Sequence, residues 1–137
     1  MKKFYFDTSI WRDYYENRSD KFRPLGEWAL MLVNKIISEE HIVLYSDLVT
    51  TELKIHYTEE EIKKMFNVLH DDALVKVDIT FSQSEEAIIL SKKRNVPFGD
   101  ALHSILARDY NAILVSRDNH FLELTDIAEI KKPEDLI

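Results

Sequence analysis

Short apolar runs alternate along the chain with longer amphipathic stretches. Short runs rich in apolar and β-branched residues are typical of strands buried in a parallel sheet. They predict strands over 3–7, 42–45, 74–79, 112–116 and 127–130. Stretches with apolar residues at helical spacing predict helices over 8–15, 26–40, 46–57, 58–69, 82–95 and 100–110.

Several predicted helices begin at side chains that can cap them. The segments 58–61 and 82–85 both have the spacing of a capping box. Thr8 or Ser9 can cap the first helix, and Asp100 is expected to cap the last one.

This alternation of strands and helices predicts the fold class α/β, as a single domain over 1–137. We expect a three-layer α/β/α sandwich with a mainly parallel central sheet and right-handed crossovers. In such sheets, ligands bind outside the carboxyl ends of the strands. Asp7 ends the first predicted strand and Asp118 closely follows the strand over 112–116, so both acids fall on that edge.

The composition narrows the kinds of site that the chain can contain. It has 137 residues, no cysteine and a formal net charge of −7. The missing cysteines exclude disulfides, zinc–thiolate sites and thiol catalysis. Only two glycines occur, and the glycine-rich phosphate-binding motifs are absent. The negative charge argues against nonspecific binding of polyanions, so nucleic-acid binding would need a local basic rim and a metal ion.

The sequence also predicts where the protein works. No segment approaches the ~18 consecutive apolar residues that a membrane span requires, so we expect no membrane association. Asp7 interrupts the N-terminal apolar run, which does not fit the core of a signal peptide. The lack of cysteine agrees with the same expectation, a cytoplasmic location.

Four acidic residues stand out by position. Glu52 lies within the apolar stripe of its helix, defined by Leu48, Val49, Leu53 and Ile55. A carboxylate that faces the core is costly unless it is paired or bound to a metal.

Each of these acids also has an ordinary interpretation. Asp7, Asp100 and Asp118 could be cap or turn residues. Glu52 could pack its methylene groups against the core while its carboxylate reaches water. If the four converge, like charges ~4 Å apart repel by about 4 kcal/mol per pair at an effective dielectric of ~20. A bound cation would be needed, and an all-oxygen ligand set suits Mg²⁺ or Mn²⁺. Such sites suit phosphodiester hydrolysis.

The order and spacing of four segments resemble the PIN-domain family over nearly the whole chain. The segments are Phe6-Asp7-Thr8-Ser9, Thr51-Glu52-Leu53, Gly99-Asp100-Ala101-Leu102-His103 and Val115-Ser116-Arg117-Asp118-Asn119-His120-Phe121. The last two are the most specific.

The resemblance implies a flavodoxin-like sheet and metal-dependent cleavage of single-stranded or structured RNA. By position, Asp7, Glu52, Asp100 and Asp118 match the family's metal-binding and catalytic acids, and Ser116 matches the hydroxyl residue beside them. Many members of this size are VapC-like toxins of toxin–antitoxin pairs. The resemblance therefore also implies a homodimer and a small antitoxin partner.

Two further residues are expected near the substrate. Arg117, between Ser116 and Asp118, is the basic residue best placed to bind a phosphate. His103 lies one turn after Asp100 and could approach the phosphate, although packing at the helix surface is the common fate of such a residue. His120 has no metal-ligand partner at a suitable spacing.

Two other functions are compatible with the pattern. The chain could be a PIN-fold module that binds RNA or protein without catalysis, although such a module has no reason to keep four mutually repelling acids. It could also be a phosphatase with Asp7 as nucleophile. Against this, the second acid that haloacid-dehalogenase-type phosphatases use two residues later is replaced here by Ser9.

Overall fold

Five short strands form one parallel sheet in the computed structural model, which describes residues 1–137. In chain order the strands are β1 (Lys3–Phe6), β2 (Ile42–Tyr45), β3 (Leu74–Lys76), β4 (Ile113–Val115) and β5 (Ile130–Lys131). Their spatial order is β3-β2-β1-β4-β5, and every neighbouring pair is parallel. The strand order reverses at β1, so β1 and β4 flank the topological switch point at which such sheets bind ligands.

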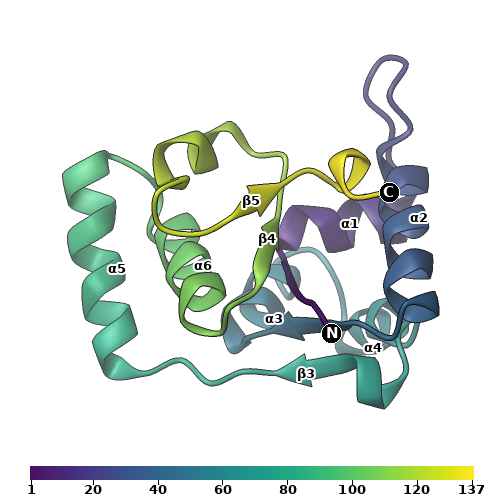
Figure 1. The fold of residues 1–137 in the computed structure, drawn as a ribbon, viewed down its shortest axis with the longest axis horizontal. Coiled ribbons are helices and arrows are strands. Elements are labelled where there is room, and N and C mark those ends of the chain that lie inside the picture. The colour runs from purple at the N-terminus through teal and green to yellow at the C-terminus, as the bar shows by residue number, and fades with distance from the viewer.

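Helices cover both faces of this sheet. They are α1 (Thr8–Glu16), α2 (Leu25–Ser38), α3 (Asp47–Leu53), α4 (Glu59–Phe66), α5 (Phe81–Arg94) and α6 (Phe98–Asp109), with 3-10 turns η1 (Asp71–Ala73), η2 (Asn119–Leu124) and η3 (Pro133–Asp135). Figure 1 shows α2 on one side of the sheet and α6, backed by α5, on the other. The predicted α/β/α sandwich is confirmed, and the sheet is entirely parallel. No helix combines the length and the apolar character that crossing a membrane demands.

The core lies between these layers, where the central strands are buried on both faces. Phe4, Tyr5 and Phe6 of β1 are all buried, as are Leu114 and Val115 of β4. This explains why the strands read as continuous apolar runs rather than as alternating patterns.

Several predicted element boundaries were wrong. The helix expected over 82–95 starts at Phe81, because Thr80 and Gln83 form its capping box. The helix expected to be capped by Asp100 starts at Phe98, after Pro97, so Asp100 lies in its first turn. The helix expected to reach Tyr57 ends at Leu53, which leaves Ile55 75% exposed.

The capping of the first helix was also mispredicted. Asp7 occupies the N-cap position of α1, and no side chain caps the helix. Thr8 and Ser9 are therefore free to bind other groups. The capping box over 58–61 is confirmed, with Thr58 and Glu61 as its partners.

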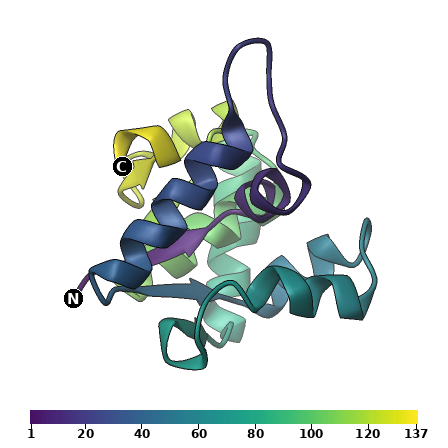
Figure 2. The ribbon, with the colours of Figure 1, turned by 90° about the vertical axis from the view of Figure 1, so that its right-hand side faces the viewer.

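The polar segment between α1 and α2 forms a narrow projecting loop. Asp20 and Arg23 pair across it, and Lys21 at its tip has a positive φ of 54°. Figure 2 shows this loop standing clear of the helices. Phe22 at the tip is fully exposed.

Candidate metal centre

The carboxyl ends of β1 and β4 bring distant acids together. Asp7 directly follows β1, and its backbone amide donates to the carbonyl of Val115 at the end of β4, at 3.0 Å. Ser116 and Asp118 follow β4 within three residues. The central pair of strands therefore places Asp7 and Asp118 on one edge, as the sequence predicted.

Asp7 is held in a fixed orientation by two hydroxyl groups. Its Oδ2 accepts hydrogen bonds from Ser9 Oγ at 2.8 Å and from Ser116 Oγ at 3.0 Å. Ser116 Oγ in turn accepts from the backbone amide of Asp118 at 3.1 Å. Burial raises the pKa of Asp7, an effect that the charge of His103 and the two hydroxyls oppose. Ser116 thus connects the two acids that follow the central strands.

Glu52 reaches the same place from α3. Its Oε1 accepts from Thr8 Oγ1 at 2.9 Å and lies 2.6 Å from His103 Nε2. Its Oε2 lies 3.3 Å from the position that a Cβ on Gly99 would take, which brings it beside the first turn of α6. Burial on its own would raise the pKa of Glu52, but the hydrogen bond and charge of His103 lower it below its ordinary value. Glu52 is therefore ionised and faces inward.

His103 is completely buried and links Glu52 to the core. Its Nδ1 lies 2.7 Å from the hydroxyl of Tyr5, which is 2.8 Å from Ser46 Oγ. Burial on its own would lower the pKa of His103, but Glu52 and Asp7, whose Oδ1 is 3.9 Å away, raise it. The two acids thus favour the protonated form of this imidazole, whose positive charge would offset part of theirs. Contact with a substrate phosphate, expected from its place on the helix, does not fit this buried position.

Asp100 completes the cluster and is its least satisfied member. Its Oδ2 is buried and has no hydrogen-bond partner. Burial, together with the negative charges of Asp7 and Asp118, raises the pKa of Asp100 to about 6. A buried carboxylate oxygen without a donor is costly. An unpartnered carboxylate oxygen of this kind is a suitable ligand for a metal ion.

His120 lies beside the outer acids, although no metal-ligand partner was predicted for it. Its Nδ1 lies 3.3 Å from Asp100 Oδ2 and 3.2 Å from Asp118 Oδ1. One ligand atom of each of Asp100, Asp118 and His120 falls within 4.8 Å of the others, close enough to share a metal ion. The expectation of no metal-ligand partner was wrong, because η2 turns the chain back toward α6. The spacing of His120, two residues after Asp118, was the only local signal.

Arg117 points away from the acids. Its guanidinium pairs with Glu134 Oε2 at 2.9 Å, lies 3.6 Å from Asp13 Oδ2, and stacks 5.8 Å from the ring centre of Trp28. Its side chain is only 12% exposed. The expected position beside a substrate phosphate does not fit these contacts. In an extended segment successive side chains point to opposite sides, so Arg117 cannot accompany Ser116 and Asp118.

Comparisons with known proteins agree with this architecture. The family model described as the PIN domain matches residues 4–127. No curated protein matches the sequence significantly.

Three solved structures share the fold at low sequence identity. A chain of a toxin–antitoxin complex from Klebsiella pneumoniae has a TM-score of 0.67 and 15% identity, covering 95% of this chain and 97% of that one. A chain of VapBC2 from Rickettsia felis, bound to a DNA fragment from its promoter, has a TM-score of 0.69 and 13% identity, covering 95% and 98%. A chain of FitAcB from Neisseria gonorrhoeae has a TM-score of 0.59 and 12% identity, covering 97% and 99%. The family match spans most of the chain, and the chain belongs to the PIN-domain family.

Proposed function

We propose that the protein is a metal-dependent endoribonuclease, and that it acts as the toxin of a toxin–antitoxin pair. One observation carries the proposal. Asp7, Glu52, Asp100 and Asp118 gather at the carboxyl edge of the sheet, and a buried oxygen of Asp100 accepts no hydrogen bond. PIN domains are typically nucleases, and this arrangement fits that activity.

The donor set fits a hard divalent cation. The site's hydrogen bonds all go to one oxygen of each partnered acid: Asp7 Oδ2, Glu52 Oε1 and Asp118 Oδ1. The second oxygen of each, with Asp100 Oδ2, is left for a metal. Asp7, Glu52, Asp100 and Asp118 would hold Mg²⁺ or Mn²⁺, ions that prefer carboxylate and water oxygens. His120 lies beside the same acids, but imidazole is a ligand that Zn, Cu, Fe and Ni prefer, whereas Mg²⁺ and Mn²⁺ prefer the carboxylates.

The surrounding residues prepare this site. Bound Mg²⁺ or Mn²⁺ would activate a water molecule and neutralise charge on the phosphodiester. Ser9 and Ser116 fix the orientation of Asp7, while Thr8 and His103 fix that of Glu52. Holding ligands by a second set of hydrogen bonds typically matters 10–100-fold in metal affinity or activity. Because the acids themselves repel RNA, activity should require the metal strictly.

The toxin assignment is supported by the fold alone. One structural neighbour is described as a toxin–antitoxin complex, the other two are VapBC2 and FitAcB, and each aligns along nearly its full length. By this likeness, we propose a small antitoxin as partner, a homodimer as the assembly, and the cytoplasm as the location. The neighbouring reading frame tests the assignment directly: a short DNA-binding protein encoded next to this chain supports it.

The nuclease activity is tested by cleavage of labelled single-stranded RNA with Mg²⁺ or Mn²⁺. We expect cleavage that a chelator abolishes and that returns when metal is restored. Asp7→Asn and Asp100→Asn should both be inactive. Asp72→Asn changes an exposed acid in η1 and should be fully active. Equal activity in all four proteins would exclude the mechanism. Metal-independent phosphatase activity toward an aryl phosphate would favour Asp7 as a nucleophile instead.

A further inference from the structure

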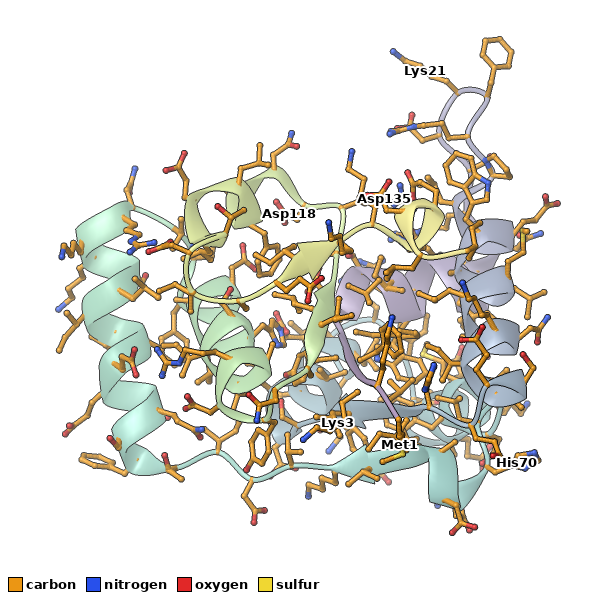
Figure 3. The ribbon with its side chains drawn as sticks, in the orientation of Figure 1. Met1, Lys3, Lys21, His70, Asp118 and Asp135 are labelled. Atoms are coloured by element: carbon orange, nitrogen blue, oxygen red, sulfur yellow. The ribbon has the colours of Figure 1, made fainter.

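A cavity opens directly beside the acidic cluster. It has a volume of about 210 Å³ and lies between η2, β5 and the start of η3. Ser116 and Asp118 line it, so it is continuous with the proposed metal centre. Figure 3 labels Asp118 and Asp135, both of which line the cavity, on the same edge of the molecule. A substrate bound through Asp118 would therefore extend into this space.

Two unpaired lysines give the cavity a positive wall. Lys131 and Lys132 both line it, both are exposed, and neither makes an ion pair. Asp135, which also lines the cavity, accepts from the backbone amide of Lys132 at 3.4 Å.

The other cations around the acids are already engaged. Arg12 pairs with Glu16 and Lys54 with Glu59, while Arg117, which also lines the cavity, pairs with Glu134. On a chain of net charge −7, an RNA strand needs a local source of positive charge next to the acids. Lys131 and Lys132 supply it.

The rest of the lining suits a nucleotide better than a free ion. Asn119 offers an amide and Thr125 a hydroxyl, groups that can bond to a ribose or a base edge. Leu122 is 70% exposed and presents an apolar side chain at the rim, where a base can pack. Cationic, hydrogen-bonding and apolar groups thus occur together beside Asp118.

We propose that this cavity, here named the lysine cavity and defined by Asn119, Leu122, Thr125, Lys131 and Lys132, binds the RNA nucleotide next to the scissile phosphate. Lys131 and Lys132 contact that nucleotide's phosphate, and the other three residues contact its sugar and base. This inference rests on the proposed nuclease function and adds the site that positions the strand. Phosphate contacts fix the register of a nucleic acid on a protein.

The test compares two double variants of equal charge change. Lys131→Ala/Lys132→Ala removes the wall of the lysine cavity. Lys2→Ala/Lys3→Ala removes two lysines at the opposite edge of the sheet, where Figure 3 shows Lys3. Steady-state cleavage of a short labelled single-stranded RNA in Mn²⁺ gives kcat and KM for each. In parallel, fluorescence anisotropy measures binding of the same RNA to each double variant combined with Asp7→Asn, which prevents cleavage.

We expect the cavity variant to raise KM roughly tenfold with little change in kcat, because it loses binding that ground state and transition state share. The slope of log affinity against log salt should become shallower by about 0.7, since the two lysines contact one phosphate and each neutralised phosphate contributes ~0.7 for a single strand. The control variant should match the parent protein. Mn²⁺ affinity, measured by calorimetry, should be the same in all three.

The outcomes separate this inference from the proposed function. Cleavage with equal KM in the two double variants would overturn the lysine cavity and leave the nuclease function standing. RNA binding that depends on the cavity lysines, without cleavage by any protein, would overturn the nuclease function and support the cavity. A parent protein that neither cleaves nor binds RNA would overturn both.

Discussion

Replacing Asp100 by Asn should make the metal-free protein more stable while it abolishes activity. Burial and the charges of Asp7 and Asp118 both disfavour the ionised form that Asp100 takes at neutral pH, and its Oδ2 accepts no hydrogen bond. Asn keeps the shape of the side chain, removes the charge and adds an amide donor. The substitution therefore removes the cost of a partly buried charge and the repulsion, which His103 and His120 offset only in part.

The magnitude follows from the pKa of Asp100, which rises from an ordinary 3.8 to about 6. Each pKa unit corresponds to ~1.4 kcal/mol, so ~3 kcal/mol is an upper bound. Water reaches the half-buried carboxylate and screens part of the repulsion, so we expect about 1–2 kcal/mol. For a domain of this size, that raises the midpoint of thermal unfolding by roughly 3–8 °C.

The pH dependence has a definite sign. Between the unfolded pKa of 3.8 and the folded pKa of about 6, the folded protein binds more protons at Asp100 than the unfolded chain does. Protonation of Asp100 therefore stabilises the folded protein. This stabilisation is complete below about pH 4 and is lost as the pH rises through 6. The stability gain of Asp100→Asn over the parent should be larger at pH 7 than at pH 5.

The assay is urea unfolding of both proteins with a chelator and with Mn²⁺, at pH 5 and pH 7. With Mn²⁺ at about a hundred times its Kd, the parent should gain ~2.7 kcal/mol and Asp100→Asn far less. Asp72→Asn, at an exposed acid, controls for the loss of one charge. If Asp100→Asn is no more stable than the parent in chelator, or if Mn²⁺ stabilises both equally, the reasoning about repulsion in the site is refuted.

Three further predictions concern Glu52 itself, the buried hydrogen bonds behind His103, and the packing of α1 against α2. Glu52→Gln should lower kcat about 100-fold or more and weaken Mn²⁺ binding in calorimetry; unchanged kinetics would remove Glu52 from the site. Tyr5→Phe removes the buried hydrogen-bond partner of His103 and Ser46. It should lower the free energy of unfolding, measured by urea titration, by about 1–3 kcal/mol. A change near zero would show that these buried hydrogen bonds do not stabilise the fold. Gly26→Ala should destabilise the fold by about 3 kcal/mol, since a Cβ there would come within 2.5 Å of the Asn17 backbone. A fully stable Gly26→Ala protein would mean that the α1–α2 contact yields easily.

The fold was predictable because its strongest signals are local. The apolar runs over 42–45 and 112–116 are short, as is typical of strands covered on both faces, and β2 and β4 lie in those segments. The helix starts were less predictable because several residues compete to cap each helix. The helices that were predicted to start at Ser82 and Asp100 begin earlier, with Thr80 and Pro97 at their N-cap positions. Tertiary contacts decide between such alternative caps.

The site was predictable only in part. Asp7 and Asp118 both follow apolar runs that predict strands. Because the carboxyl ends of adjacent parallel strands share one edge of the sheet, their convergence could be predicted. The pairing of Glu52 with His103, 51 residues apart, depends on how α3 and α6 pack and has no local signal. Thr8 carries two possible roles, and only the structure shows that it binds Glu52 instead of capping α1.

Whether the four acids hold a metal ion can be seen in a crystal structure of the protein grown with Mn²⁺, with anomalous scattering measured at the manganese edge. We expect an anomalous peak bonded to carboxylate oxygens of Asp7, Asp100 and Asp118, with Glu52 as a ligand or hydrogen-bonded to its water. Density for manganese elsewhere, or none in this cluster at saturating Mn²⁺, would contradict it.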